Sequence, residues 1–122
     1  MKLSLVVPCY NEAENVQPFQ DAVIQAFDGC GYDYEIVFIN DGSTDATLHN
    51  LKKIFSRQLC PVKVVSFSRN FGKESGIFAG LQQASGDYIS LIDVDLQQRP
   101  EIVRNMVKML DEDDDIDVVA GY

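Results

Sequence analysis

The stretch YISLIDVDLQ, residues 88–97, decides the predicted fold. Its apolar run from Tyr88 to Ile92 is typical of a buried strand, and Asp93, Asp95 and Gln97 follow where that strand ends. On an extended backbone, the i, i+2 spacing places the two carboxylates on one face. Open parallel sheets bind ligands outside the carboxyl ends of their strands. The stretch therefore predicts a strand that ends at a ligand site.

Two interpretations of this acidic pair remain open at this point. Two carboxylates and the amide oxygen of Gln97 suit a hard divalent cation that keeps room for phosphate oxygens. Alternatively, Asp93 and Asp95 cap the following helix and lie in water. Because Asp-x-Asp is short and common, the rest of the chain has to decide.

The same alternation of strand and helix extends through the chain. Continuous apolar runs predict strands at 3–8, 34–39, 62–67 and 87–92, and a fifth strand begins at 117–120. The intervening segments carry apolar residues at helical spacing: Val16, Phe19, Val23 and Phe27; Leu48, Leu51, Ile54 and Phe55; Ile77, Phe78, Leu81 and Ala84; and Val103, Met106, Val107 and Leu110. We therefore predict one α/β domain, a Rossmann-like and mostly parallel sheet with helices on both faces.

Local signals place the ends of these elements. Pro8 is expected to stop the first strand, and Asn11 with Glu14 resembles a capping box. Ser43 or Thr44 is a good N-cap for the second helix, and Pro100 suits the first turn of the fourth. The acidic run 111–115 is expected to form a solvated turn, because negative charge is unfavourable at a helix C-terminus.

Composition limits the partners and the compartment. The 122 residues carry a net charge of −9, which argues against a nucleic-acid surface but not against a nucleotide whose phosphates a cation neutralises. No apolar run approaches the roughly 20 residues of a membrane span, and no signal peptide is visible. Three cysteines give neither a disulfide framework nor a zinc site, which indicates reduced thiols in the cytoplasm. We expect Cys9 to be a neutral filler and His49 a surface residue.

Polar side chains follow each of the first four strands. They are Tyr10, Asn11 and Glu12 after the first, Asn40 and Asp41 after the second, Arg69 and Lys73 after the third, and Asp93 and Asp95 after the fourth. Acids after three different strands are hard to explain as solvated turns alone. Their common position at one sheet edge predicts a metal-assisted nucleotide site.

Four motifs resemble the family 2 glycosyltransferases: VVPCYNE at 6–12, NDGSTD at 40–45, RNFGK at 69–73 and DVDLQ at 93–97. They occur in order over the whole chain, and the last two resemble the polyprenyl-phosphate branch, with its dolichol-phosphate mannosyltransferases and bactoprenol glucosyltransferases. The resemblance implies the GT-A form of the fold. It also implies that residues 1–122 are the donor-binding, N-terminal part of a longer, here truncated domain.

The resemblance also implies roles for single residues. Positions matching Pro8, Tyr10, Glu12, Ile39 and Asp41 hold the nucleoside of a UDP- or GDP-sugar, and Asp93, Asp95 and Gln97 match the metal and diphosphate site for Mg²⁺ or Mn²⁺. Arg69 and Lys73 are further candidates for donor or phosphate contacts. The chain departs from the family at Asn40, Val94 and Gln98-Arg99. No catalytic residue is assigned with certainty within the chain.

The expected reaction is hexose transfer from the nucleotide-sugar to a polyprenyl phosphate. A saccharide acceptor in cell-wall or surface polysaccharide synthesis is the alternative. The acceptor site is expected mostly outside this chain, so the fragment alone is expected to be inactive. A homo-oligomer is left open, and the full-length protein is expected at the cytoplasmic face of the membrane.

Three rival classes fit less well. A dinucleotide-dependent oxidoreductase needs a Gly-x-Gly-x-x-Gly turn after the first strand, where this chain has Pro8-Cys9-Tyr10. A phosphoacceptor signalling domain, the non-enzymatic rival, and a haloacid-dehalogenase-type phosphatase both place their acids at that first strand end. Here the acidic pair follows the fourth strand.

Overall fold

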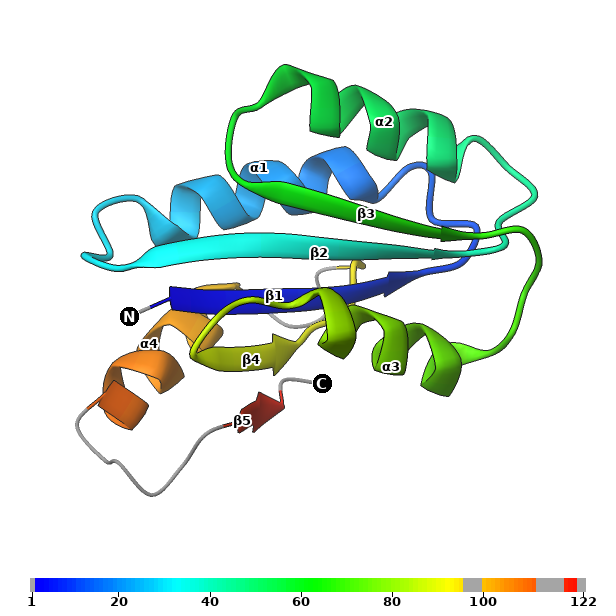
Figure 1. Ribbon diagram of the computed structural model, residues 1–122. Helices are drawn as coiled ribbons and strands as arrows, with labels where there is room; N and C mark the ends of the chain where they lie inside the picture. Colours follow the sequence, from blue (N-terminus) through cyan, green and yellow to red (C-terminus); the bar gives the residue numbers. More distant parts are fainter. Residues whose placement is uncertain (1, 96–99, 112–117, 121–122) are drawn as a thin grey trace.

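The first strand, β1, lies at the centre of the sheet. The computed structural model describes residues 2–95, 100–111 and 118–120. Within them β1 (Lys2–Cys9) pairs in parallel with β2 (Asp33–Asp41) on one side and with β4 (Tyr88–Leu91) on the other. β3 (Val62–Phe67) pairs with β2, and β5 (Val118–Ala120) with β4, so the order is β3-β2-β1-β4-β5. All described pairs are parallel, which confirms the predicted sheet (Figure 1).

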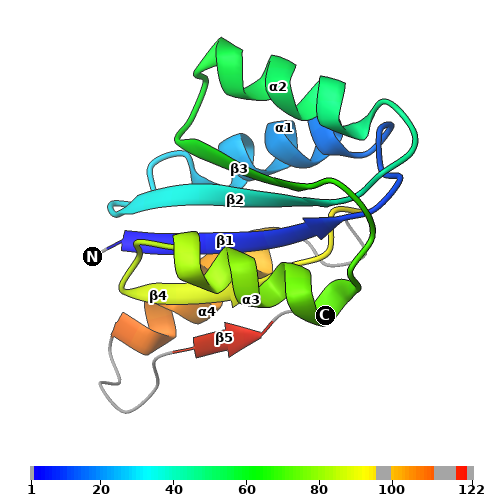
Figure 2. The same ribbon diagram turned by 45° about the vertical axis from the view of Figure 1, so that its right-hand side comes forward.

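Helices cover both faces of this sheet (Figures 1 and 2). The helices α1 (Val16–Phe27), α2 (Thr47–Arg57) and α4 (Pro100–Asp111) lie on one face, where Leu3, Leu5, Ile36 and Phe38 form the main core. α3 (Lys73–Gln83) lies on the other face, over Val6, Val37 and Ile39. Residues of one strand alternate between the two cores, as the period of a strand requires.

The strand β1 continues through Pro8 to Cys9, so the expectation that proline stops it is wrong. The Val6 carbonyl accepts a hydrogen bond from the Ile92 N–H. The backbone groups of Val6, and of every second residue from it, therefore face the β4 side of the strand. Pairing with β4 ends at the Val6–Leu91 pair. Pro8 therefore lacks its N–H on a side where no neighbouring strand needs it, and the ladder to β2 stays intact.

The helix α3 packs through only part of the predicted stripe, since Ala84 contacts the core while Phe78 and Leu81 do not. Phe78 and Leu81 are 63% and 41% exposed, whereas Gly76 and Gly80 are buried against the sheet. A Cβ placed on Gly80 would lie 2.6 Å from Val6 Cγ1 and 2.7 Å from Ile39 Cδ1. The helix backbone itself thus fills the space that side chains fill elsewhere. At Gly80 this close approach requires glycine, whereas a Cβ on Gly76 would make an ordinary contact of 3.4 Å with Ile39 Cγ2.

The other helices follow their predicted stripes more closely. Val16, Phe19, Val23, Phe27, Leu51, Ile54 and Val103 are buried as predicted, whereas Phe55 is 54% exposed. α4 begins at Pro100 as predicted. The side chains of Met106, Val107 and Leu110, and residues 112–115 of the acidic run, lie outside the described part of the chain. Among the described helices, none is long and apolar enough to cross a bilayer.

Candidate functional site

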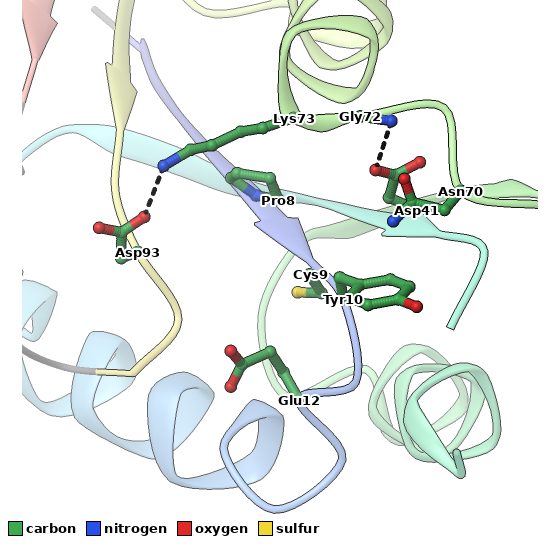
Figure 3. Close-up of a pocket in the computed structure, with 9 residues that line it drawn as sticks. All are labelled: Pro8, Cys9, Tyr10, Glu12, Asp41, Asn70, Gly72, Lys73 and Asp93. Carbon is green, nitrogen blue, oxygen red and sulfur yellow. Dashed lines mark hydrogen bonds and ion pairs between the residues drawn. The ribbon is translucent and has the colours of Figure 1, made fainter. Parts of the chain in front are cut away.

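A pocket of about 360 Å³ opens at the carboxyl ends of β1 and β2, beside the residues that follow β4 and the start of α3. Its lining consists of Pro8, Cys9, Tyr10, Glu12, Asp41, Asn70, Gly72, Lys73 and Asp93 (Figure 3). Six of these, Pro8, Tyr10, Glu12, Asp41, Lys73 and Asp93, are predicted site residues. The pocket lies at the edge where open parallel sheets bind ligands, as the sequence predicts.

The loops after β1 and β2 are joined by side-chain to backbone hydrogen bonds. The Asn11 N–H donates to Ser43 Oγ at 2.9 Å, the Thr44 N–H donates to Asn11 Oδ1 at 2.8 Å, and the Glu12 N–H donates to Thr47 Oγ1 at 2.9 Å. Asn11 itself has a φ of +54°, a conformation that asparagine tolerates better than most residues. This network fixes the loop that carries Tyr10 and Glu12 into the pocket.

The same contacts overturn two predicted helix caps. Asn11 does not cap α1, which begins five residues later at Val16 without a side-chain cap. Neither Ser43 nor Thr44 caps α2, which begins at Thr47. The Thr47 N–H instead donates a hydrogen bond to Asp45 Oδ1 at 2.9 Å. The polar residues that looked like local caps serve contacts between loops, which a local sequence pattern does not reveal.

Asp41 holds the loop that leads into α3. Its carboxylate is buried and accepts hydrogen bonds from the Phe71 N–H at 2.8 Å and from the Gly72 N–H at 3.0 Å, of which Figure 3 draws the second. Asn40 has a structural role as well: its Oδ1 accepts from the Ser43 N–H and its Nδ2 donates to Ser66 Oγ. The last two residues of β2, Asn40 and Asp41, thus organise the pocket wall.

Three carboxylates and one ammonium face the pocket. Glu12 Oε2 accepts from Asn15 Nδ2 at 2.5 Å, and Lys73 Nζ lies 3.4 Å from Asp93 Oδ1. The charges of Glu12, Asp41 and Asp93 therefore outnumber that of Lys73 by two. Such a site favours a divalent cation and, through that cation, an anionic group.

Cys9 is the thiol of this pocket, and it is inert. It is 1% exposed, and its Sγ–H donates to the Val7 carbonyl at 3.6 Å. Burial, with the Glu12 carboxylate as a second cause, raises the pKa of the Cys9 thiol far above its usual range. The thiol therefore stays protonated, in agreement with its predicted role as a neutral filler. His49 is exposed on α2, as predicted.

Three other predicted site residues, Ile39, Arg69 and Asp95, do not line the pocket. Ile39 is fully buried beneath α3. Arg69 is exposed and stacks its guanidinium 4.6 Å from the centre of the Phe71 ring. Asp95 is exposed and is not among the lining residues, and Gln97 lies outside the described part of the chain.

Asn70 and Gly72 line the pocket without having been singled out. Both belong to the RNFGK motif, which is the sequence feature that could have identified them as pocket residues. Gly72 has a φ of +100°, and its backbone N–H is the group that binds Asp41. A contribution from the backbone cannot be recognised from residue type.

Comparisons with known proteins identify relatives of this chain. The family model "Glycosyl transferase family 2" matches residues 4–122. The chain is 46% identical over 110 residues to the bactoprenol glucosyl transferase of Shigella phage SfV, covering 88% of this chain and 35% of that protein. It is 37% identical over 122 residues to the dodecaprenyl-phosphate galacturonate synthase of Rhizobium johnstonii, covering 100% of this chain and 36% of that protein. The chain thus spans about a third of the length of these relatives.

A solved structure shows the same fold. The mannosyltransferase PcManGT from Pyrobaculum calidifontis, in complex with GDP-Man and Mn²⁺, superposes with a TM-score of 0.76. Its sequence is 24% identical, and the match covers 88% of this chain and 32% of that one. The described α/β sheet is therefore that of a known glycosyltransferase architecture.

Proposed function

The chain belongs to glycosyl transferase family 2, and on that premise we propose that it is the donor-binding part of an enzyme that transfers a hexose from a UDP- or GDP-sugar to a polyprenyl phosphate. The carrying observation is the pocket at the carboxyl edge, where Tyr10, Glu12, Asp41, Lys73 and Asp93 converge. The polyprenyl acceptor rests on the names of the relatives, which are a bactoprenol glucosyl transferase and a dodecaprenyl-phosphate galacturonate synthase. We place the full-length enzyme at the cytoplasmic face of the membrane.

In this proposal the nucleoside lies against the loops after β1 and β2. Tyr10 is 47% exposed at the pocket, so its ring is available for contact with a base or ribose. Glu12 and Asp41 provide carboxylate oxygens for ribose hydroxyls or a base N–H. Both oxygens of Asp41 already accept one backbone hydrogen bond, so Asp41 reaches the nucleoside only through its remaining lone pairs.

The diphosphate lies on the other side of the pocket, near Asp93 and Lys73. Asp93 is partly exposed and its oxygens are suitable ligands for Mg²⁺ or Mn²⁺, with Asp95 and Gln97 as the further proposed ligands. In the described part of the chain, no three His, Cys, Asp or Glu side chains form a metal-holding group. Phosphate oxygens and water would therefore complete the coordination. The Mn²⁺ in the Pyrobaculum mannosyltransferase supports a divalent ion here.

The chemistry follows from the charge that develops in the reaction. Breaking the bond between the anomeric carbon and the diphosphate places negative charge on the leaving group. A bound divalent ion would supply Lewis-acid stabilisation of that charge. Asp93 would bind the ion, and Lys73 would add a positive charge beside the phosphates. The hydrogen-bonded loops after β1 and β2 would orient the nucleoside so that the sugar projects toward the acceptor.

Calorimetric titration with Mn²⁺ and UDP or GDP tests the proposal. We expect the chain to bind a nucleoside diphosphate in the presence of Mn²⁺ and to bind no NAD. Asp93→Asn and Asp95→Asn should each weaken binding by at least the roughly 10- to 100-fold that loss of an outer-shell metal partner costs. Asp95→Asn should have the larger effect.

Asp33→Asn is the matched control, because Asp33 is an exposed acid at the amino end of β2, whereas the pocket lies at the carboxyl ends of the strands. It should leave binding unchanged. Binding of Mn²⁺ and nucleotide by both pocket variants as tightly as by the parent would show that the metal site has been assigned to the wrong residues.

A further inference from the structure

Lys73 and Asp93 form an ion pair between two distant parts of the chain. Lys73 is the first residue of α3, Asp93 follows β4, and the Nζ–Oδ1 distance is 3.4 Å. Figure 3 shows the lysine side chain extending past Pro8 to reach this carboxylate. The carboxylate is the one that the proposed function gives to the metal, so the lysine and the cation compete for the same group.

The ion pair can be exchanged at small cost. Its side chains are 57% and 36% exposed, and ion pairs of this kind contribute little to stability because water and salt screen them. The lysine ammonium is a point charge on a flexible stem, so it changes partner without a change in the backbone. A divalent cation on Asp93 would repel the ammonium at short range.

The backbone that carries Lys73 is fixed independently of this pair. Gly72, the preceding residue, donates its N–H to Asp41, and so does Phe71. When the ammonium leaves Asp93, the base of the side chain therefore remains at the pocket. The nearest new anion in the proposed complex is the donor diphosphate.

We propose that Lys73 exchanges its partner when the site fills. Lys73 neutralises Asp93 until a divalent cation binds that carboxylate, and the displaced ammonium then binds the donor's diphosphate. This inference rests on the proposed function and adds an order of events to it. Before the site fills, Lys73 is paired with Asp93; afterwards the cation is paired with Asp93 and Lys73 with the diphosphate, so both charges have a partner at each stage. The lysine thereby opposes binding of the metal alone and favours binding of metal and nucleotide together.

Two titrations on one variant distinguish this exchange from a simple phosphate contact. Lys73→Met should bind Mn²⁺ alone about two- to fivefold more tightly than the parent, because a competing cation is gone. With Mn²⁺ present, the same variant should bind UDP or GDP about tenfold more weakly, because a charged hydrogen bond is lost. Lys73→Arg keeps a charge that reaches both partners and should stay close to the parent in the Mn²⁺ titration.

Arg69→Met controls for overall charge. Arg69 is an exposed cation in the loop before α3 that does not line the pocket, so its loss should change the affinity for Mn²⁺ alone less than the loss of Lys73 does. If Lys73→Met gains no affinity for Mn²⁺ alone, or if Arg69→Met gains as much, the exchange is refuted while the donor site stands. If the parent binds neither Mn²⁺ nor a nucleoside diphosphate, the proposed function fails, and the exchange fails with it.

Discussion

Gly42 shows how little space separates the two loops that form the pocket wall. Its φ is +67°, and a Cβ at this position would lie 2.1 Å from the Arg69 carbonyl carbon and 2.3 Å from the Asn70 nitrogen. Both contacts are to backbone, which cannot turn aside as a side chain can. The neighbouring Asp41 binds the same loop through the Phe71 and Gly72 N–H groups. The hydrogen bonds between Asp41 and the loop before α3 therefore require the close approach of that loop to Gly42.

Gly42→Ala should destabilise the fold by at least about 2 kcal/mol, because the alanine must take a left-handed conformation and also push the loop away. Urea unfolding measures the difference. Gly29→Ala is the matched control: Gly29 has a φ of +69° but nothing within 4 Å of a Cβ, so it carries the conformational cost alone. Equal losses in the two variants would mean that the contact with Arg69 and Asn70 does not restrain the loop.

Residue types predicted most of the pocket but not the direction of every side chain. Acids and a lysine placed just after strands do line it, because a strand end in a parallel sheet leaves few other places for them. Ile39, which only the family resemblance assigned to the nucleoside, does not line the pocket. In a strand with two buried faces, an apolar sequence does not say which residues point to which face, and Ile39 points to α3.

At the scale of elements, α3 is the helix that the apolar pattern described least well. The pattern counts large side chains, and Phe78 and Leu81 carried the prediction. The structure buries Gly76 and Gly80 instead. Helices α1 and α2 were placed more accurately because their contacts with the sheet are made by ordinary apolar side chains such as Phe19 and Leu51.

Gly80→Ala should lower stability by about 1 to 3 kcal/mol, because the added methyl overpacks a contact with Val6 and Ile39. The gain in helix propensity, about 1 kcal/mol, offsets only part of that cost. Phe78→Ala, two residues earlier on the exposed side of the helix, should change stability by about 0.5 kcal/mol at most. Thermal unfolding of both variants gives the comparison. A larger loss for Phe78→Ala than for Gly80→Ala would reverse the assigned orientation of α3.

At the scale of the whole molecule, one buried carboxylate connects most of the sheet. Glu35 in β2 is 2% exposed and accepts hydrogen bonds from Ser4 Oγ in β1 and from the Ser85 N–H before β4. Lys63 of β3 lies 3.1 Å from its other oxygen, and Lys2 of β1 lies 3.7 Å away. Burial opposes ionisation of Glu35, but these hydrogen bonds outweigh it and lower its pKa to about 2.

Acid should therefore destabilise the fold through Glu35. Its pKa is lower in the folded chain than the ordinary 4.5, so the stabilisation is present above about pH 4.5 and is lost as the pH falls toward 2. The shift corresponds to about 3 kcal/mol. Denaturant unfolding of Glu35→Gln should show lower stability at pH 7 and a flatter decline between pH 4.5 and 2, whereas Glu14→Gln, an exposed control, should follow the parent. A parallel decline for parent and Glu35→Gln would contradict this role.

The architecture as a whole was predictable because strand and helix alternate and the strands are apolar throughout, which leaves a parallel sheet as the consistent solution. The connections between elements were less predictable. Asn11, Ser43, Thr44 and Glu35 make contacts over more than 30 residues, and such contacts have no local pattern. The same long-range contacts shape the pocket and stabilise the fold.

The central position of β1 also affects the order in which the fold can form during synthesis. β1 is translated before the other described strands, and its partner β2 follows soon after, in a register that pairs Leu3 with Tyr34. Its other partner is far later in the chain, at the register Leu3–Tyr88. Until β4 has been made, one edge of this central, largely buried strand has no neighbour, and an unpaired apolar edge is where chains associate wrongly. The strand that is translated first is thus among the last to be fully paired.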